Sequence, residues 1–362
     1  MAGKIYIVTS VYPPDVAGPG VYFASLKEAV ARRGWIVAVL VRPSLGAVLR
    51  AVRSEDIVLA HGTPKILLTV FLAKVIRRFK FISRIGGDYF WERSVERGEY
   101  AGTLRSFYAS HRLSAMRHMP LRWFMCFVFR RADALVFTGP LLYDIYVPLF
   151  GLDKKKVFVI THPLSELTVK NLTTYESRQL PAIRYKMLYA GRFLKLKNLE
   201  MFLEIFAEAR KKHPNLVLTL IGDGPEKQRL AVSVGRLCLK NAVIFKESMR
   251  RDEVLEEIVA HHLVVLPSFS EVSPNLLMDA VTAGTPFLAT QENGLREVLE
   301  GAGTWFNPMS KEDFAYKLET LLAPGALEEA RERMRSHPYR KTWSEVAEEY
   351  ERVFKFSAQP FN

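Results

Sequence analysis

Short apolar strands alternate with amphipathic helices along almost the whole 362-residue chain, and this alternation constrains the fold more than any other feature. Strands are expected in two runs, at 4–10, 35–42, 56–61, 81–86, 134–138 and 157–162, and then at 186–190, 216–221, 242–246, 263–267, 286–290 and 303–306. Such strands between helices are typical of parallel sheets that are buried on both faces. We therefore expect an α/β protein with two doubly wound, Rossmann-like domains.

A polar stretch separates the two runs of strands. It contains Asn171, Thr173, Thr174 and Ser177, which favour turns and loops. The sequence therefore predicts an N-terminal domain over 1–165, a linker over 166–184 and a C-terminal domain over 185–340. Ligands of open α/β sheets bind at the carboxyl ends of the strands, so the loops that follow the strands are where a site is expected.

Positive charge is concentrated in the first half of the chain. Residues 1–180 contain 26 Lys and Arg against 13 Asp and Glu, whereas residues 181–362 contain 25 of each kind. A one-sided positive field attracts anionic partners such as phospholipid surfaces, acidic glycans or nucleic acid. No nucleic-acid-binding motif accompanies the charge, so nucleic acid is the least favoured partner.

The two cysteines, Cys126 and Cys238, fit neither a metal-binding spacing nor a disulfide framework, which favours a reducing compartment. A strand expected from residue 4 leaves no room for a signal peptide. The longest candidate for a membrane span, 132–150, contains Asp133 and Asp144 and fits a strand plus a short helix better. We expect a cytoplasmic protein, and the charge adds a peripheral position on the inner face of the membrane as an option.

The segment 264–299 combines an apolar strand, a polar loop and the start of a helix. Pro274 suits the first helical position because its missing N–H would be unpaired there. Free backbone N–H groups at a helix N-terminus bind anions and sugar hydroxyls. The carboxylates of Glu271 and Asp279 bracket these groups, so the segment predicts a site for a phosphorylated, polyhydroxylated ligand.

The loop after the strand at 186–190 supplies two cations, Arg192 and Lys197. Two fixed cations at the carboxyl end of a strand suit a diphosphate, which needs charge compensation as it leaves. In the first half, Gly18 and Gly20 let the backbone approach a ligand closely, although a plain strand-to-helix turn explains them equally well. His61 ends a strand, where it either lines a site or caps the next helix.

Arg84 interrupts the apolar strand at 81–86, and two glycines, Asp88 and Tyr89 follow it. Asp88 is the strongest site candidate of the first half, and the alternative is a turn or N-cap aspartate. Tyr89 begins a run of three aromatic residues that either stack on a sugar or pack the domain. Arginines and aromatic residues mixed over 104–131 either lie on an anionic membrane or belong to two helices that pack the sheet.

Several motifs of the second half occur together, in the order and spacing of the family-4 glycosyltransferases of the GT-B fold, which the chain resembles. They are Gly191 to Asn198, Ile221 to Glu226, Leu266 to Ser268, Glu271 to Asn275, Ala283 to Pro286 and Gly294 to Glu297. The match in the first half is looser. The resemblance implies two Rossmann-like domains that face a central cleft, with residues 341–362 as a final helix that crosses back to the first domain.

The resemblance also implies roles in a nucleotide-sugar site. Arg192 and Lys197 would hold the diphosphate, Glu271 would act at the sugar, and Asp279, which replaces the usual Glu, would hold the ribose. Further donor-binding positions would be Gly18, Gly20, Gly222, Ser273, Pro274, Asn275 and Leu276. No histidine follows the strand at 81–86, which leaves Asp88 as a catalytic candidate, with acceptor-side or cleft positions at His61, Arg84 and Tyr89.

The implied activity is that of a retaining, metal-independent glycosyltransferase, which moves a sugar from a nucleotide-diphosphate sugar to a glycan or lipid-linked acceptor. No cofactor or metal is expected, because Arg and Lys take the place of the metal. The basic first half would meet the acceptor or an anionic membrane surface. The alternatives are a sugar-nucleotide epimerase or phosphorylase on the same fold, and a protein that binds nucleotide sugars without catalysis.

Overall fold

The computed structural model of the chain describes residues 3–13, 18–110, 119–164 and 185–358. It divides into two compact units. The first comprises Met1–Glu92, Phe107–Pro163 and Lys341–Asn362, and the second comprises Arg93–Ser106 and Leu164–Arg340. The linker predicted over 166–184 lies outside the described residues.

The first unit contains a six-stranded parallel sheet in the order β2-β1-β3-β4-β5-β6. Its strands are β1 (Ile5–Thr9), β2 (Val37–Val41), β3 (Ile57–His61), β4 (Lys80–Ile85), β5 (Ala134–Phe137) and β6 (Val157–Val159). The chain passes from β1 to β2 on one side and then to β3 on the other. The switch point of this sheet therefore lies between β1 and β3.

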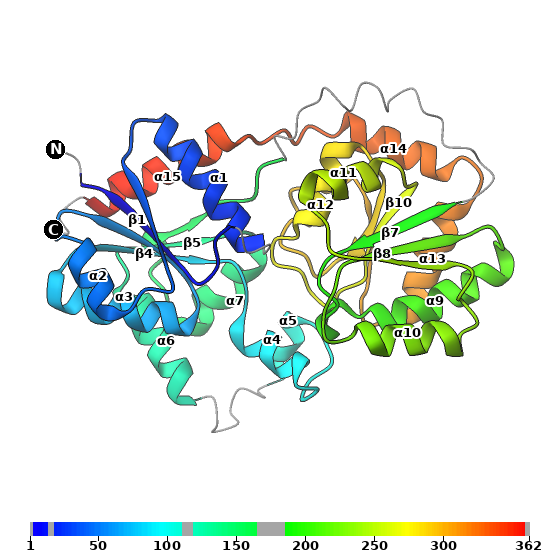
Figure 1. Cartoon of the computed structure of the whole chain (residues 1–362), viewed down its shortest axis with the longest axis horizontal. Helices are drawn as coiled ribbons and strands as arrows, with labels where there is room; N and C mark the ends of the chain where they lie inside the picture. Colours follow the sequence, from blue (N-terminus) through cyan, green and yellow to red (C-terminus); the bar gives the residue numbers. More distant parts are fainter. Residues whose placement is uncertain (1–2, 14–17, 111–118, 165–184, 359–362) are drawn as a thin grey trace. The chain divides into compact units, whose positions relative to one another are not determined.

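Helices cover both faces of the first sheet (Figure 1). They are α1 (Gly18–Arg32), α2 (Leu45–Ala51), α3 (Pro64–Arg77), α6 (Met119–Arg131), α7 (Pro140–Phe150) and α15 (Trp343–Ala358), with a 3-10 turn η3 (Lys154–Lys156). Two further helices, α4 (Tyr89–Glu96) and α5 (Leu104–Ala109), each contribute residues to both units. The final helix α15 packs against α1. Its buried residues Trp343, Val346, Tyr350 and Phe354 recur three or four positions apart, which gives an amphipathic helix an apolar stripe.

The second unit contains a second six-stranded parallel sheet in the order β12-β11-β10-β7-β8-β9. Its strands are β7 (Lys186–Ala190), β8 (Val217–Ile221), β9 (Val243–Lys246), β10 (Leu263–Leu266), β11 (Phe287–Thr290) and β12 (Thr304–Phe306). The chain runs from β7 outward to β8 and β9, and then returns to β10 on the other side of β7. The switch point therefore lies between β7 and β10.

Helices also cover both faces of the second sheet (Figure 1). They are α9 (Leu199–Lys212), α10 (Lys227–Arg236), α11 (Arg251–Val259), α12 (Asn275–Ala283), α13 (Lys311–Leu322) and α14 (Ala326–Ser336), with a 3-10 turn η4 (Lys195–Lys197). The expected α/β class and the two doubly wound sheets are confirmed. All twelve expected strands occur, and α9 has the predicted bounds.

Candidate functional site

The carboxyl ends of β7 and β10 are neighbours at the switch point of the second sheet. In the loop after β7, Asn198 adopts a left-handed conformation with φ 52° directly before α9. This loop exposes Arg192 and half-buries Lys197. Among the described residues, the Arg192 guanidinium has no ion-pair or hydrogen-bond partner, so it is available to an anionic ligand.

Glu271 is the buried centre of the loop after β10, with 7% of its surface exposed. Its Oε1 accepts hydrogen bonds from Lys197 Nζ at 2.6 Å and from Ser268 Oγ at 2.5 Å. Its backbone is held as well, because its N–H donates to Glu292 O and its carbonyl accepts from Gly294 N–H, each at 2.8 Å. The structure therefore brings together the cation predicted for the diphosphate and the carboxylate predicted for the sugar.

Two glycines let the loops of this site approach one another. Gly222 has φ +139°, and a Cβ there would lie 2.1 Å from Gly191 O. A Cβ on Gly294 would lie 2.0 Å from Val272 O. The space beside Gly222, predicted as a donor-binding position, is thus filled by the loop that carries Arg192.

The helix α12 begins at Asn275, one residue after the predicted start, and Pro274 is its N-cap. Pro274 makes no side-chain cap hydrogen bond to the first-turn N–H groups, which include those of Asn275 and Leu276. Ser273 Oγ and Asn293 Nδ2 are also buried and have no hydrogen-bond partner within the described part of the chain. Buried polar groups normally find partners, so these orphans near Glu271 suit a ligand rich in oxygen atoms.

Asp279 is buried on α12 and forms an ion pair with Arg251. The Arg251 Nη2 and Nε atoms lie 2.6 Å and 3.1 Å from Asp279 Oδ1. Arg251 is the first residue of α11. A ribose at Asp279, as the resemblance implies, would therefore share that carboxylate with Arg251.

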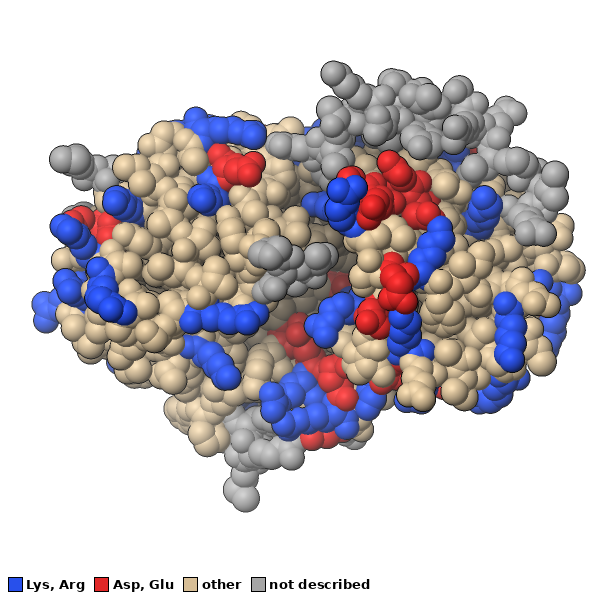
Figure 2. All heavy atoms as spheres, viewed as in Figure 1, with Lys and Arg blue, Asp and Glu red and all other residues tan. Residues whose placement is uncertain are grey.

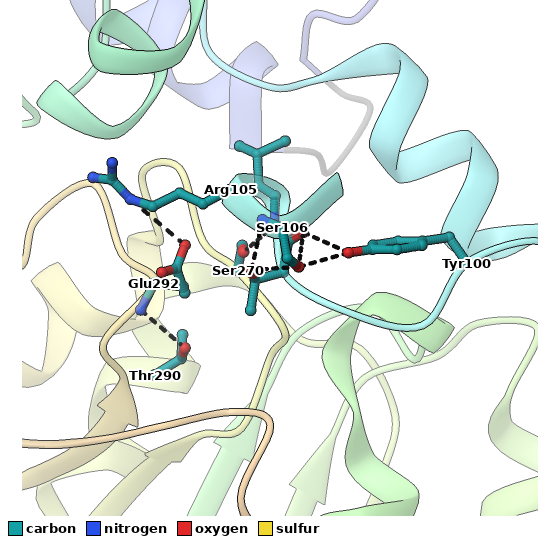
Figure 3. A network of polar contacts seen from close by, with 8 residues as sticks. Tyr100, Arg105, Ser106, Ser270, Thr290 and Glu292 are labelled. Carbon is teal, nitrogen blue, oxygen red and sulfur yellow. Dashed lines mark hydrogen bonds and ion pairs between the residues drawn. The ribbon is translucent and has the colours of Figure 1, made fainter. Parts of the chain in front are cut away.

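A segment from the first half of the sequence belongs to the second unit and braces the Glu271 loop. Figure 3 shows residues from the segment 93–106 against the loops after β10 and β11. Leu104 N–H donates to Ser270 Oγ at 2.8 Å, and Arg105 Nε lies 3.8 Å from Glu292 Oε2. Burial raises the pKa of the Glu292 carboxyl, while the Arg105 charge lowers it. The residue directly before Glu271 is thus tied to a segment far away in sequence.

The same segment forms one wall of a pocket of about 220 Å³ in the second unit. Tyr100 contributes its ring to the wall, and its hydroxyl lies 2.6 Å from Ser106 Oγ (Figure 3). The opposite wall includes Lys195 and Asn198 from the loop after β7, together with Glu226 and Arg229 from the next loop and helix. The pocket therefore lies beside the loop that carries Arg192 and Lys197, and it is partly charged.

Asp88, the catalytic candidate of the first half, is completely buried in the first unit. Its Oδ1 accepts from Trp91 N–H at 2.6 Å, as the side chain of an N-cap does at a helix start. Its Oδ2 accepts from the Tyr146 hydroxyl at 2.7 Å and from the Tyr108 hydroxyl. Burial raises the pKa of the carboxyl and these hydrogen bonds lower it. With both oxygens occupied by protein groups, the geometry favours the N-cap alternative.

His61 and Arg84 are neighbours across β3 and β4 at the carboxyl edge of the first sheet. The Arg84 guanidinium is buried, 3.8 Å from the centroid of the Tyr22 ring and 3.3 Å from His162 Nε2. Burial and the Arg84 charge lower the pKa of His61 to about 4. Of these predicted acceptor-side residues, Arg84 therefore lies in the interior of the first unit, and His61 is half-buried.

The other candidates of the first unit lie at helix starts. Gly18 and Gly20 form the first turn of α1, behind residues 14–17, which fall outside the described ranges. Tyr89 opens α4 half-buried, with its ring 5.8 Å from that of Phe90. Over the described part of the chain, no cluster of three His, Cys, Asp or Glu residues could hold a metal ion. In the same part, no helix is long and apolar enough to cross a membrane.

Comparison with known proteins gives a class for this architecture. Residues 175–341 match the family described as glycosyl transferases group 1, and the match falls in the second unit, where Arg192, Lys197 and Glu271 lie. Sucrose-phosphate synthase from Thermosynechococcus elongatus superposes with a TM-score of 0.76 at 18% identity, over 97% of this chain and 98% of that one. HepE from Anabaena, solved in complex with UDP-glucose, gives a TM-score of 0.73 at 14% identity, over 97% and 99%. The chain therefore has the fold of the GT-B glycosyltransferases.

Curated relatives match over shorter regions. The sulfoquinovosyl transferase SQD2 of Arabidopsis thaliana is 29% identical over 141 residues, which cover 38% of this chain and 26% of SQD2. The alpha-D-kanosaminyltransferase of Streptomyces kanamyceticus is 29% identical over 145 residues, or 40% and 38% of the two chains. The matched region thus spans well under half the length of these two relatives.

Sequence reasoning missed the groups that hold the predicted residues in place. Ser268 donates to Glu271, Arg251 pairs with Asp279, and residues 93–106 brace Ser270. Ser268 stands three residues before Glu271 in a polar loop, so it carried a weak local signal. The other two contacts join segments 28 and 166 residues apart, and no local pattern marks them.

Proposed function

We propose that this protein is a glycosyltransferase that takes its sugar from a nucleotide-diphosphate sugar bound at the switch point of the second sheet. The observation that carries the proposal is the contact between Lys197 and Glu271, on loops that also present the exposed guanidinium of Arg192. Cations for a diphosphate and a carboxylate for sugar hydroxyls lie on adjoining loops. The match of this unit to the group 1 glycosyl transferases supports the assignment.

The charges in this site suit the departure of a nucleoside diphosphate. In the transfer, the bond between the anomeric carbon and the phosphate oxygen breaks, and a bond from an acceptor oxygen to that carbon forms. Arg192 and Lys197 would stabilise the negative charge that develops on the leaving diphosphate. The acceptor hydroxyl proton would pass to the departing phosphate oxygen. This chemistry needs no metal, and we propose that it retains the anomeric configuration.

The donor sugar would lie over the N-terminus of α12. There Glu271 and the first-turn N–H groups of Asn275 and Leu276 offer an acceptor and donors for sugar hydroxyls. Lys197 and Ser268 both donate hydrogen bonds to Glu271. The Glu271 carboxylate would therefore orient the Lys197 ammonium towards the diphosphate of a bound donor. We propose a glycan or lipid-linked molecule as the acceptor, and a cytoplasmic location for the enzyme.

Two observations favour a second candidate, a protein that binds nucleotide sugars without transferring them. Asp279 is occupied by Arg251, and the interior position of Asp88 removes the carboxylate predicted to act in the first half. Such a protein would bind the donor and leave it intact. Turnover therefore separates the two candidates.

A product assay tests the proposal. The protein is incubated with UDP-, GDP- and ADP-sugars and a panel of glycan and glycolipid acceptors, and release of the nucleoside diphosphate and the anomeric configuration of the product are followed by NMR. We expect release that depends on both donor and acceptor, with retention at the anomeric carbon and no loss in the presence of EDTA. Donor binding without release would favour the binding protein, and inversion or EDTA sensitivity would contradict the proposed mechanism.

A further inference from the structure

The outward faces of α3 and α6 form an apolar surface that the fold of the first unit does not explain. Its members are between 41% and 69% exposed, and we call them the α3–α6 surface: Leu68, Leu72, Val75, Ile76, Trp123 and Phe127. The two helices are in contact, and the rings of Phe71 and Phe127 meet edge to face at 5.3 Å. Large apolar side chains gathered on one exposed face commonly mark an interaction site.

The spacing of these residues shows that the surface is not the core face of either helix. On α3, Ile66, Leu67, Val70 and Ala73 are buried against the unit, as an amphipathic helix requires. The opposite face of α3 would then be polar, yet Leu68, Leu72, Val75 and Ile76 occupy it. A helix that is apolar on both faces requires a second apolar environment on its outer side.

Positive charge surrounds this apolar face. Neither α3 nor α6 contains an Asp or a Glu. Lys74 on α3 is half-buried and pairs with Asp133, and the other cations of the two helices, with the residue that caps α3, are Lys65, Arg77, Arg78, Arg122, Arg130 and Arg131. The Arg131 guanidinium stacks 3.7 Å from the centroid of the Phe127 ring, so one cation lies directly on the apolar surface. In Figure 2, Lys and Arg clearly outnumber Asp and Glu on the visible face of the first unit.

A pocket of about 300 Å³ adjoins Trp123. Cys126, Leu149 and Phe150 line it together with two arginines, Arg122 and Arg130. The Arg130 Nε donates to Phe150 O at 2.7 Å, which fixes that arginine at the wall. A pocket with apolar residues and two arginines in its lining suits a group with an apolar part and an anionic head.

We propose that the α3–α6 surface docks the protein on an anionic phospholipid membrane. The apolar side chains would enter the interface, and the surrounding cations would meet headgroup phosphates. Charge favours a membrane over a second copy of the chain, because two such surfaces in contact would bring their cations together and repel each other. The proposed donor site lies in the other unit, so this inference does not rest on it. The sequence indicates a membrane contact over 104–131 as one alternative, and the structure adds α3 to that contact.

Vesicle sedimentation tests the surface with the full-length protein. Phosphatidylcholine vesicles with and without phosphatidylglycerol are compared, at low and high salt. We expect binding only when phosphatidylglycerol is present, and weaker binding at high salt because counterions screen the cations. Equal binding to both kinds of vesicle, or none to either, would overturn the proposal.

Matched double variants locate the contact. Trp123→Ser with Ile76→Ser removes two members of the surface, and Tyr316→Ser with Val232→Ser removes two residues of the second unit that are each 66% exposed. We expect the first pair to lower vesicle partitioning by about tenfold or more, since two large apolar groups would no longer leave water. The second pair should bind as the wild type does.

Two further measurements separate a lost membrane contact from misfolding and from self-association. Circular dichroism and nucleotide-sugar binding should be unchanged in both double variants, so a misfolded protein or a failed donor site would be recognised separately. Sedimentation velocity shows whether the chain self-associates. If Trp123→Ser with Ile76→Ser abolished a dimer and left vesicle binding intact, the surface would be an interface between copies, and the membrane proposal would be wrong.

Discussion

Glu271 accepts hydrogen bonds from Lys197 and Ser268, and the loss of its charge should mainly affect the ammonium of Lys197. In Glu271→Gln the side chain keeps its volume, but the ion pair at 2.6 Å is lost and a half-buried ammonium loses its counter-charge. We expect a loss of about 1–3 kcal/mol in the free energy of unfolding, together with weaker turnover. Urea denaturation measures the first effect and the product assay the second.

The matched control for this substitution is Glu247→Gln. Glu247 forms an ion pair of similar length with Lys227, at 2.8 Å, but its side chain is 79% exposed. An exposed pair contributes about 0–1 kcal/mol. If both substitutions destabilised the protein equally, Glu271 would not be the buried centre that the structure indicates.

His61 should make the first unit sensitive to acid. Its pKa is lowered from 6.5 to about 4 in the folded protein. Between these two pH values His61 is therefore protonated in the unfolded chain and neutral in the folded chain. Stability from this group is complete above pH 6.5 and is lost as the pH falls towards 4. We expect a loss of about 2 kcal/mol between pH 7 and pH 5, and a smaller loss in His61→Gln. An imidazole that titrates near pH 6.5 by NMR would contradict this.

The sequence could predict the positions of Arg192, Lys197 and Glu271 in the fold better than those of the candidate residues in the first unit. Arg192, Lys197 and Glu271 follow apolar strands within a few residues, so strand position alone predicts their place at the sheet edge. The structure places Asp88 inside the first unit because Tyr108 and Tyr146 enclose it. Those tyrosines are distant in sequence, and no local pattern predicts that contact.

Among the elements, the segment 93–106 should control the order of the Glu271 loop. Ser270→Ala removes the acceptor of the buried Leu104 N–H, and an unsatisfied buried donor costs about 1–3 kcal/mol. We expect faster hydrogen exchange at Leu104 and its neighbours and weaker donor binding. Ser336→Ala, on the exposed end of α14, should leave both unchanged. Unaltered exchange at Leu104 in Ser270→Ala would show that the contact does not hold this segment.

The final helix should be an integral part of the first unit. Phe354 on α15 is buried with Trp343 and Tyr350, in one core with Tyr22 and Phe23. Phe354→Ala should lower the free energy of unfolding by about 3–5 kcal/mol, because it removes a buried aromatic ring and leaves a cavity. Phe356→Ala, which truncates a half-buried ring on the same helix, should cost clearly less. Equal losses in thermal or urea unfolding would contradict the placement of α15.

The elements were the most predictable level of the structure. Each expected strand occurs within about three residues of its predicted ends, because buried parallel strands are short, nearly unbroken apolar runs. Pro274 is the N-cap of α12 rather than its first residue, a shift of one position. Proline fits both positions at a helix start. The transfer of 93–106 to the second unit was not predictable, since it depends on tertiary contacts such as Leu104 with Ser270.

In the molecule as a whole, charge and chemistry are divided between the two units. The first half of the chain carries the excess of positive charge and the exposed apolar α3–α6 surface, and the neutral second half carries the proposed donor site. This division fits an enzyme that holds a small anionic donor in one unit and meets an acceptor or a surface with the other. Composition predicted the division of charge, but only the folded helices show that Leu72, Ile76 and Trp123 are exposed on two helices that contact each other.

A calorimetric titration of nucleotide-diphosphate sugars into the wild type, Arg192→Ala and Lys195→Ala tests whether the loop after β7 binds the diphosphate. Arg192 and Lys195 lie in the same loop, so the second substitution removes a nearby cation that we do not place on the diphosphate. We expect binding to the wild type, a loss of about tenfold to a hundredfold in affinity in Arg192→Ala, and near-wild-type affinity in Lys195→Ala. Absence of binding by any nucleotide sugar, or equal affinity in all three proteins, would contradict the proposed donor site.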